Sequence, residues 1–94
     1  MHIKILGFNL FAKGGTSRSN INLIKAFIKS GYNVTYYNYN NYTQNEFFNT
    51  MINEGLSQGQ LDIKQYKKST DLTGAEFVIL TRETFFYIAR EIKK

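Results

Sequence analysis

Two short strand-like runs flank an amphipathic stretch in the first forty residues, and this succession constrains the fold more than any other feature. Residues 3–6 are mostly apolar, and residues 34–39 are β-branched and aromatic, so both are typical of strands. Between them, apolar residues recur at helical spacing from residue 16 onward, and Gly31 is placed to end the helix. A helical crossover between two strands makes them parallel and is right-handed. The sequence therefore predicts a βαβ unit.

The remainder of the chain predicts a second helix, two further strands and a last helix. Thr43 and Glu46 have the spacing of a capping box, and Gly55 is placed to end the helix that begins there. Residues 61–66 alternate weakly, as edge strands do, whereas residues 77–80 form an uninterrupted apolar run followed by a helical pattern. We expect one domain over residues 1–94.

The expected fold class is α/β, a Rossmann-like three-layer sandwich with a four-stranded parallel sheet in the order 3-2-1-4. In this order the outer edge of the fourth strand has no partner, although residues 77–80 are apolar throughout. Exposed apolar edges pair with other chains. We therefore expect a homodimer through this edge, or pairing with further chain.

The composition excludes several kinds of chemistry. The 94 residues contain no cysteine and one histidine, His2, so they lack the side chains for a disulfide framework, a thiolate metal site or a Ser-His-Asp triad. The net charge of +5 is spread along the chain rather than gathered in a basic arm, so no nucleic-acid partner is expected. No run resembles a signal peptide or a membrane span, which predicts a cytoplasmic protein. Its positive charge is compatible with peripheral contact at the inner face of the membrane.

A glycine pair, Gly14-Gly15, lies between the first strand and the first helix and predicts an anion site. The two glycines have no Cβ to block the close approach of a ligand to the backbone. The free N–H groups of the following helix point at a negative group bound there. Thr16 and Ser17 supply capping hydroxyls, and Arg18 is placed to pair with a phosphate or an acceptor. Ligands of parallel sheets bind beyond the carboxyl ends of the strands. The other residues expected to line a cleft there are Asn9, Lys13, Thr81, Arg82 and Glu83.

Two common nucleotide loops do not fit this glycine pattern. Gly7, Gly14 and Gly15 do not have the G-x-G-x-x-G spacing of a dinucleotide site. Asn38 and Asn40 stand where an acidic residue would hold a ribose, and no G-K-[ST] sequence forms a Walker A loop.

Residues 14–18 (GGTSR) resemble the first loop of the N-terminal half of GT-B glycosyltransferases of the family 4 type, in which an arginine stands three residues after a glycine pair. Residues 30–35 (SGYNVT) resemble the glycine and strand that follow the same helix in that family. The resemblance covers residues 3–39 and, more weakly, residues 77–82. It implies a partial, N-terminal half of a GT-B fold.

Such a domain is the acceptor side of an enzyme that transfers a sugar from a nucleotide-sugar donor to a cell-surface glycan or glycoprotein. The resemblance implies that a second domain holds most of the donor and the catalytic residues, so this chain is expected to be inactive alone. Backbone N–H groups of the glycine loop would stabilise the leaving diphosphate, a scheme that requires no metal or other cofactor.

Two alternatives remain open. Residues 13–19 (KGGTSRS) overlap the variant phosphate loop of partitioning-type ATPases, although Ser17 and Arg18 replace its glycine and lysine. The chain would then be a degenerate nucleotide-binding protein. The second alternative is a stand-alone Rossmann-like binding or oligomerisation module.

Overall fold

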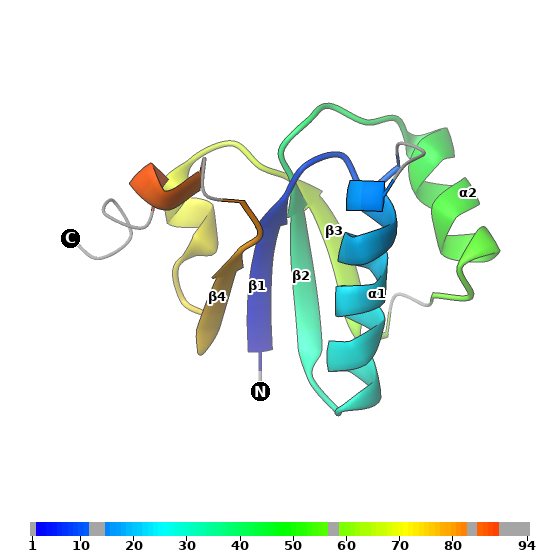
Figure 1. Cartoon of the computed structure of the whole chain (residues 1–94), viewed down its shortest axis with the longest axis horizontal. Coiled ribbons are helices and arrows are strands. Elements are labelled where there is room, and N and C mark those ends of the chain that lie inside the picture. Colours follow the sequence, from blue (N-terminus) through cyan, green and yellow to red (C-terminus); the bar gives the residue numbers. More distant parts are fainter. Residues whose placement is uncertain (1, 12–14, 57–58, 83–84, 89–94) are drawn as a thin grey trace.

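The computed structural model describes residues 2–11, 15–56, 59–82 and 85–88 and shows an α/β fold with a four-stranded, all-parallel sheet. The strand order is β3-β2-β1-β4, which confirms the predicted order and fold class (Figure 1). The strands are β1 (His2–Gly7), β2 (Asn33–Asn38), β3 (Leu61–Gln65) and β4 (Phe77–Leu80). The helices are α1 (Gly15–Lys29), α2 (Gln44–Asn53) and the 3-10 helix η1 (Ser69–Leu72), and a further helical turn covers residues 86–88.

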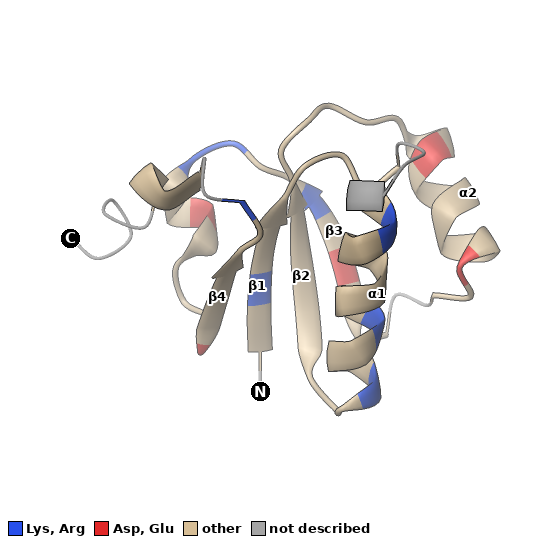
Figure 2. Ribbon diagram, viewed as in Figure 1, with Lys and Arg blue, Asp and Glu red and all other residues tan. Residues whose placement is uncertain are grey.

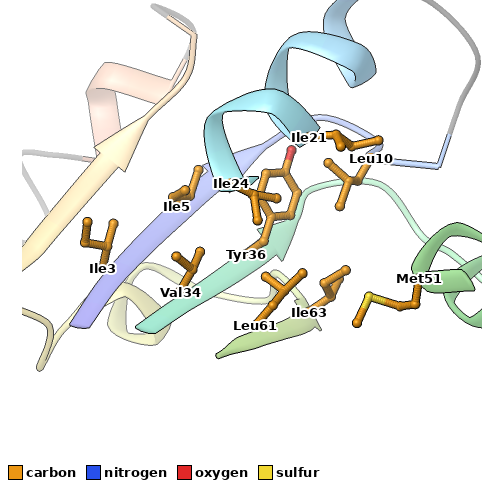
Figure 3. Packing of buried hydrophobic residues seen from close by; sticks show 10 residues of the cluster. All are labelled: Ile3, Ile5, Leu10, Ile21, Ile24, Val34, Tyr36, Met51, Leu61 and Ile63. Atoms are coloured by element: carbon orange, nitrogen blue, oxygen red, sulfur yellow. The ribbon is translucent and has the colours of Figure 1, made fainter. Parts of the chain in front are cut away.

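The larger core lies on the face of the sheet that α1 and α2 cover. Because successive side chains of a strand point to opposite faces, odd positions of β1 and even positions of β2 turn toward these helices. The helices contribute residues at helical spacing, and Figure 3 shows them packed over the strands. The buried members of this cluster are Ile3, Ile5, Leu10, Ile21, Ile24, Val34, Tyr36, Met51, Leu61 and Ile63.

A smaller core covers the opposite face and completes the predicted three layers. It contains Leu6 and Tyr37 from the sheet, Leu72 from η1, and Phe85 and Ile88 near the end of the described chain. The side chain of Lys4 also lies on this face, where its Nζ donates hydrogen bonds to the carbonyls of Asp71 (2.8 Å) and Thr73 (2.6 Å). A lysine in a central strand thus secures the layer that η1 belongs to.

The helix ends follow the signals in the sequence. Thr43 caps α2 reciprocally with Glu46: the Glu46 N–H donates to Thr43 Oγ1 (3.2 Å), and the Thr43 N–H donates to Glu46 Oε1 (3.0 Å). Gly31 and Gly55 follow α1 and α2 with φ of +91° and +67°, a conformation that favours glycine. Among the described residues, no helix has the length and apolar character needed to cross a membrane.

Gly7, the last residue of β1, allows a close approach between the sheet and α1. A Cβ at this position would lie 2.0 Å from Tyr36 Oη and 2.9 Å from Asn20 Nδ2. The Tyr36 hydroxyl donates to the Phe8 carbonyl (2.7 Å) and accepts from Asn20 Nδ2 (3.0 Å). Burial raises the pKa of Tyr36, so the hydroxyl stays protonated and keeps its donor role. Glycine is needed here for packing.

The variant Gly7→Ala is expected to lose about 2–3 kcal/mol of unfolding free energy, because the added methyl group overlaps a fully packed hydroxyl. Urea unfolding followed by circular dichroism measures the loss. Asn22→Ala, on the exposed side of α1, is the control and should stay within about 0.5 kcal/mol of the parent chain. In the double variant with Tyr36→Phe, the two losses should be less than additive. A Gly7→Ala variant as stable as the parent would contradict this packing.

Candidate functional site

The four strands end at one edge of the sheet, and polar residues follow each of them. Asn9 comes shortly after β1, Asn38 and Asn40 stand at the end of β2, Gln65 is the last residue of β3, and Thr81 follows β4. Figure 1 shows that α1 also begins at this edge. The first four of these residues are neutral amides, which we call the amide rim. This edge is where parallel sheets bind ligands.

The buried side chain of Asn38 forms hydrogen bonds that hold the two loops of the rim together. Its side chain is fully buried, at 0% exposure. Its Oδ1 accepts from the Leu10 N–H (2.7 Å), and its Nδ2 donates to the Asn40 carbonyl (2.6 Å). The Asn9 N–H donates in turn to Asn40 Oδ1 (2.9 Å). These bonds join the loop after β1 to the turn after β2, so the segment that leads to the glycine pair is anchored before residue 12.

The amides of Asn9 and Asn40 keep donors available for a ligand. Neither Nδ2 group has a hydrogen-bond partner among the residues that the structure describes. Gln65 Nε2 donates to the Asn38 carbonyl (2.9 Å), whereas its Oε1 has no such partner there. Amides do not titrate near neutral pH, so they can orient hydroxyl or phosphate groups but cannot transfer protons.

The structure describes part of the predicted glycine-loop site. Gly14 and Lys13 lie outside the described residues, as does Glu83 on the neighbouring loop. Gly15 is the first residue of α1, and the side chain of Thr16 also lies outside the described part. Ser17 is 6% exposed, so its hydroxyl lies under neighbouring groups.

Arg18 makes an ion pair that sequence analysis does not predict. Its guanidinium lies 2.6 Å from the Glu54 carboxylate, and Lys25 Nζ lies 2.9 Å from the other oxygen of the same group. Glu54 is the C-cap residue of α2. The two cations stand seven residues apart on one face of α1, so the carboxylate ties α1 to α2. An anion bound at the glycine loop would compete with Glu54 for Arg18.

Thr81 and Arg82 follow β4 at the same edge. The Thr81 hydroxyl donates to the Leu6 carbonyl (3.0 Å), and so does its backbone N–H (3.2 Å). These bonds hold the end of β4 against the end of β1, beside the anchored loop that contains Asn9. Arg82 is exposed, and it also interacts with another residue.

Several basic residues lie at this edge, and others lie on β1 and further along α1 (Figure 2). Lys64 and Lys67 lie at or just beyond the end of β3, Arg82 follows β4, and Arg18 is in the first turn of α1. A hollow of about 460 Å³ is lined by both lysines together with Asp71 and Tyr37, and Tyr37 belongs to the face of the sheet opposite α1. Three of these cations have acidic neighbours: Arg18 pairs with Glu54, Lys64 Nζ lies 3.7 Å from Asp62 Oδ2, and Lys67 lines the hollow together with Asp71. No three histidine, aspartate or glutamate side chains converge as metal ligands within the described chain.

The Glu54 ion pairs predict how stability depends on pH. The hydrogen bond from Lys25 is the largest influence on the Glu54 pKa, and Arg18 adds to it, so the pKa lies below its usual value of 4.5. The stabilisation is therefore complete above pH 4.5 and is lost as the pH falls through the lowered folded-state pKa. Glu54→Gln should lower the Tm at neutral pH and low salt, and this loss should shrink at acid pH as the Glu54 carboxylate is protonated.

Thermal unfolding at both pH values measures this difference. Lys25→Gln should share the neutral-pH loss, whereas Lys29→Gln, an exposed charge near the end of the same helix, is the matched control. An equal Tm difference for Glu54→Gln at neutral and acid pH would contradict an ionic role.

Comparison of the chain with protein-family models, with curated protein sequences and with solved structures gives no significant match. The functional argument therefore depends on the residues of this chain and on their arrangement.

Proposed function

We propose that this chain is the N-terminal, acceptor-side domain of a glycosyltransferase that uses a nucleotide-sugar donor and a cell-surface glycan or glycoprotein acceptor. The observation that carries the proposal is the start of α1 at Gly15, at the carboxyl edge of a parallel sheet and with Arg18 in its first turn. Helix N–H groups and cations together favour a diphosphate at this edge. The rim amides of Asn9 and Asn40 suit the hydroxyl groups of a sugar.

In this proposal the chain binds the diphosphate of the donor and stabilises its negative charge. A second domain supplies the rest of the site. As an acceptor hydroxyl oxygen bonds to the anomeric carbon, the bond from that carbon to the diphosphate oxygen breaks. The electron pair leaves with the diphosphate, and the acceptor proton passes to a base. Main-chain N–H groups at the start of α1 and the guanidinium of Arg82 stabilise the negative charge that develops. We place the reaction in the cytoplasm, at or near the inner face of the membrane.

Titration of the ¹⁵N-labelled chain with a uridine diphosphate sugar tests the binding step. We expect millimolar affinity, with amide shifts concentrated at Leu10, Gly15 and Ser17. Arg82→Gln should weaken binding about tenfold, the equivalent of one charge-assisted hydrogen bond. Lys29→Gln removes the same charge from the far end of α1 and is the matched control.

The same titration separates the alternatives. Shifts confined to other regions, or equal effects of Arg82→Gln and Lys29→Gln, would overturn the proposed diphosphate site. Tighter binding of Mg·ATP than of the nucleotide sugar would favour the degenerate nucleotide-binding protein.

A second candidate function, self-association, is favoured by the outer edge of β4. Within the described chain, β4 pairs with β1 alone. The Thr81 N–H bonds toward β1, so the alternation of a strand turns the N–H groups of Val78 and Leu80 to the open side. Residues 77–80 contain no charged residue and no proline. Charged residues and proline are what usually keep an exposed strand edge from pairing with another chain.

The hydrogen-bonding pattern restricts how two such edges can pair. In an antiparallel pair, residues whose backbone groups face outward must stand opposite one another. Placing Ile79 on a two-fold axis sets Val78 opposite Leu80 of the second copy. The same register brings Glu76 opposite Arg82 of the second copy, so charges of opposite sign meet at both ends of the pairing.

Light scattering after size exclusion tests self-association across a range of concentrations. The parent chain should form a dimer, and Val78→Pro should be monomeric, because proline removes an N–H that faces outward and leaves the pairing with β1 intact. Val78→Thr keeps the N–H and the branched shape, so it should remain dimeric. A parent chain that is monomeric throughout, or a dimeric Val78→Pro variant that is folded by circular dichroism, would refute this pairing.

A further inference from the structure

A second candidate binding site lies between the first turns of α2 and the outer edge of β3. It is a cavity of about 470 Å³, within the range of small-molecule sites. Aromatic rings of Tyr42, Phe47 and Phe48 form one part of its lining. Polar side chains of Gln44, Asp62 and Gln65 form the other. The cavity therefore combines apolar ring faces with hydrogen-bonding groups.

The aromatic part offers exposed ring surface to a ligand. Tyr42 and Phe47 are nearly parallel, with 6.5 Å between ring centroids and 22° between planes, and Phe48 stands at 88° to Phe47. Phe48 is 51% exposed although it is a large apolar side chain. The faces of aromatic rings are electron-rich and attract C–H groups that carry partial positive charge. An aliphatic ring with such C–H groups on one face fits this wall.

The polar part accepts hydrogen bonds and carries negative charge. The Asp62 carboxylate is exposed and can only accept, and Gln65 Oε1 has no hydrogen-bond partner among the described residues. Burial and the nearby Asp62 charge both raise the pKa of Tyr42. Lys64 Nζ lies 3.7 Å from Asp62 Oδ2 and offsets part of its charge, so these acceptors match a neutral ligand with several O–H donors.

The outer edge of β3 is partly protected against an added strand. The Tyr42 hydroxyl donates to the Ile63 carbonyl (3.2 Å), which takes up an edge group that a peptide strand would need. Asp62 and Lys64 add charges along the same strand. A compact ring, rather than an extended peptide, therefore fits the cavity.

We propose that the cavity between α2 and β3 binds a neutral sugar ring, which stacks on Phe48 and donates hydroxyl hydrogens to Asp62 and Gln65. This site goes beyond the proposed transferase function, since its lining includes neither a residue of α1 nor Arg82. It gives the domain a place to hold a glycan by a residue remote from any reacting sugar.

Titration of the ¹⁵N-labelled chain with neutral oligosaccharides of glucose, mannose and N-acetylglucosamine tests the site. At least one should bind with millimolar affinity and shift the amides of Gln44, Phe48 and Ile63. Phe48→Ala should weaken binding about tenfold, the scale of one aromatic contact. Asp62→Asn, which keeps the shape but loses the charged acceptor, should weaken it severalfold. Ile52→Ala is the matched control, because Ile52 is an apolar α2 residue that is 76% exposed and outside the cavity.

The alternatives give different outcomes. No shift at the cavity with any of the oligosaccharides, or equal weakening by Phe48→Ala and Ile52→Ala, would overturn the proposal. Tighter binding of choline than of every sugar would do so as well, because a carboxylate beside aromatic rings can also hold a quaternary ammonium group. A diphosphate that shifts only amides near the glycine loop, without sugar binding at the cavity, would leave the transferase proposal intact and refute this one.

Discussion

The burial of β1 on both faces is the constraint from which the rest of this structure follows. Ile3, Ile5 and Leu6 are at most 2% exposed, and they point to opposite sides of the sheet. A strand of this kind must lie inside a sheet and needs cover above and below. The crossovers through α1 and α2 cover one face, and η1 with residues 85–88 covers the other. Parallel neighbours on both sides then bring all the strand ends to one edge, where binding groups can gather.

Hydrogen bonds from polar side chains near this core fix the positions of the surrounding loops and helices. The side chains of Asn38, Tyr36 and Lys4 each form hydrogen bonds with a loop or helix that the apolar core alone would not position. No buried side-chain nitrogen or oxygen in the described chain lacks a partner. Loss of one partner would leave the other group buried without a hydrogen bond, which costs about 1–3 kcal/mol. The loop before the glycine pair is therefore held by specific hydrogen bonds, as a binding edge requires.

The architecture could be predicted because its signals are local. The capping box of Thr43 and Glu46, the glycines after two helices and the apolar run at residues 77–80 each determine an element from neighbouring residues. The strand order then follows from the handedness of crossovers.

The details of the sites depend on contacts between distant residues, which no local pattern reports. Arg18 meets Glu54, and Asn38 holds the N–H of Leu10, only after the elements have packed. The one sequence signal for such a contact is a polar residue at the end of an apolar strand, as Asn38 is. This signal indicates that the side chain needs a hydrogen-bond partner but does not identify that partner. Similarly, Tyr42 and Ile63 are 21 residues apart, so the partial protection of the β3 edge emerges only in the folded chain.

The strand order places the cavity beside β3 and the open edge of β4 at opposite ends of the sheet. β3 and β4 are the two ends of the sheet, so a second copy paired with β4 would leave the cavity beside β3 open. The surfaces differ in chemistry as well. The carboxyl edge is basic, the cavity contains a carboxylate beside aromatic rings, and residues 77–80 are uncharged. The surfaces nevertheless share two residues: Gln65 belongs to the amide rim and to the cavity lining, and Arg82 serves both the proposed diphosphate site and the pairing of β4. A domain with this layout can hold a glycan at one end of its sheet while the carboxyl edge binds the charged donor.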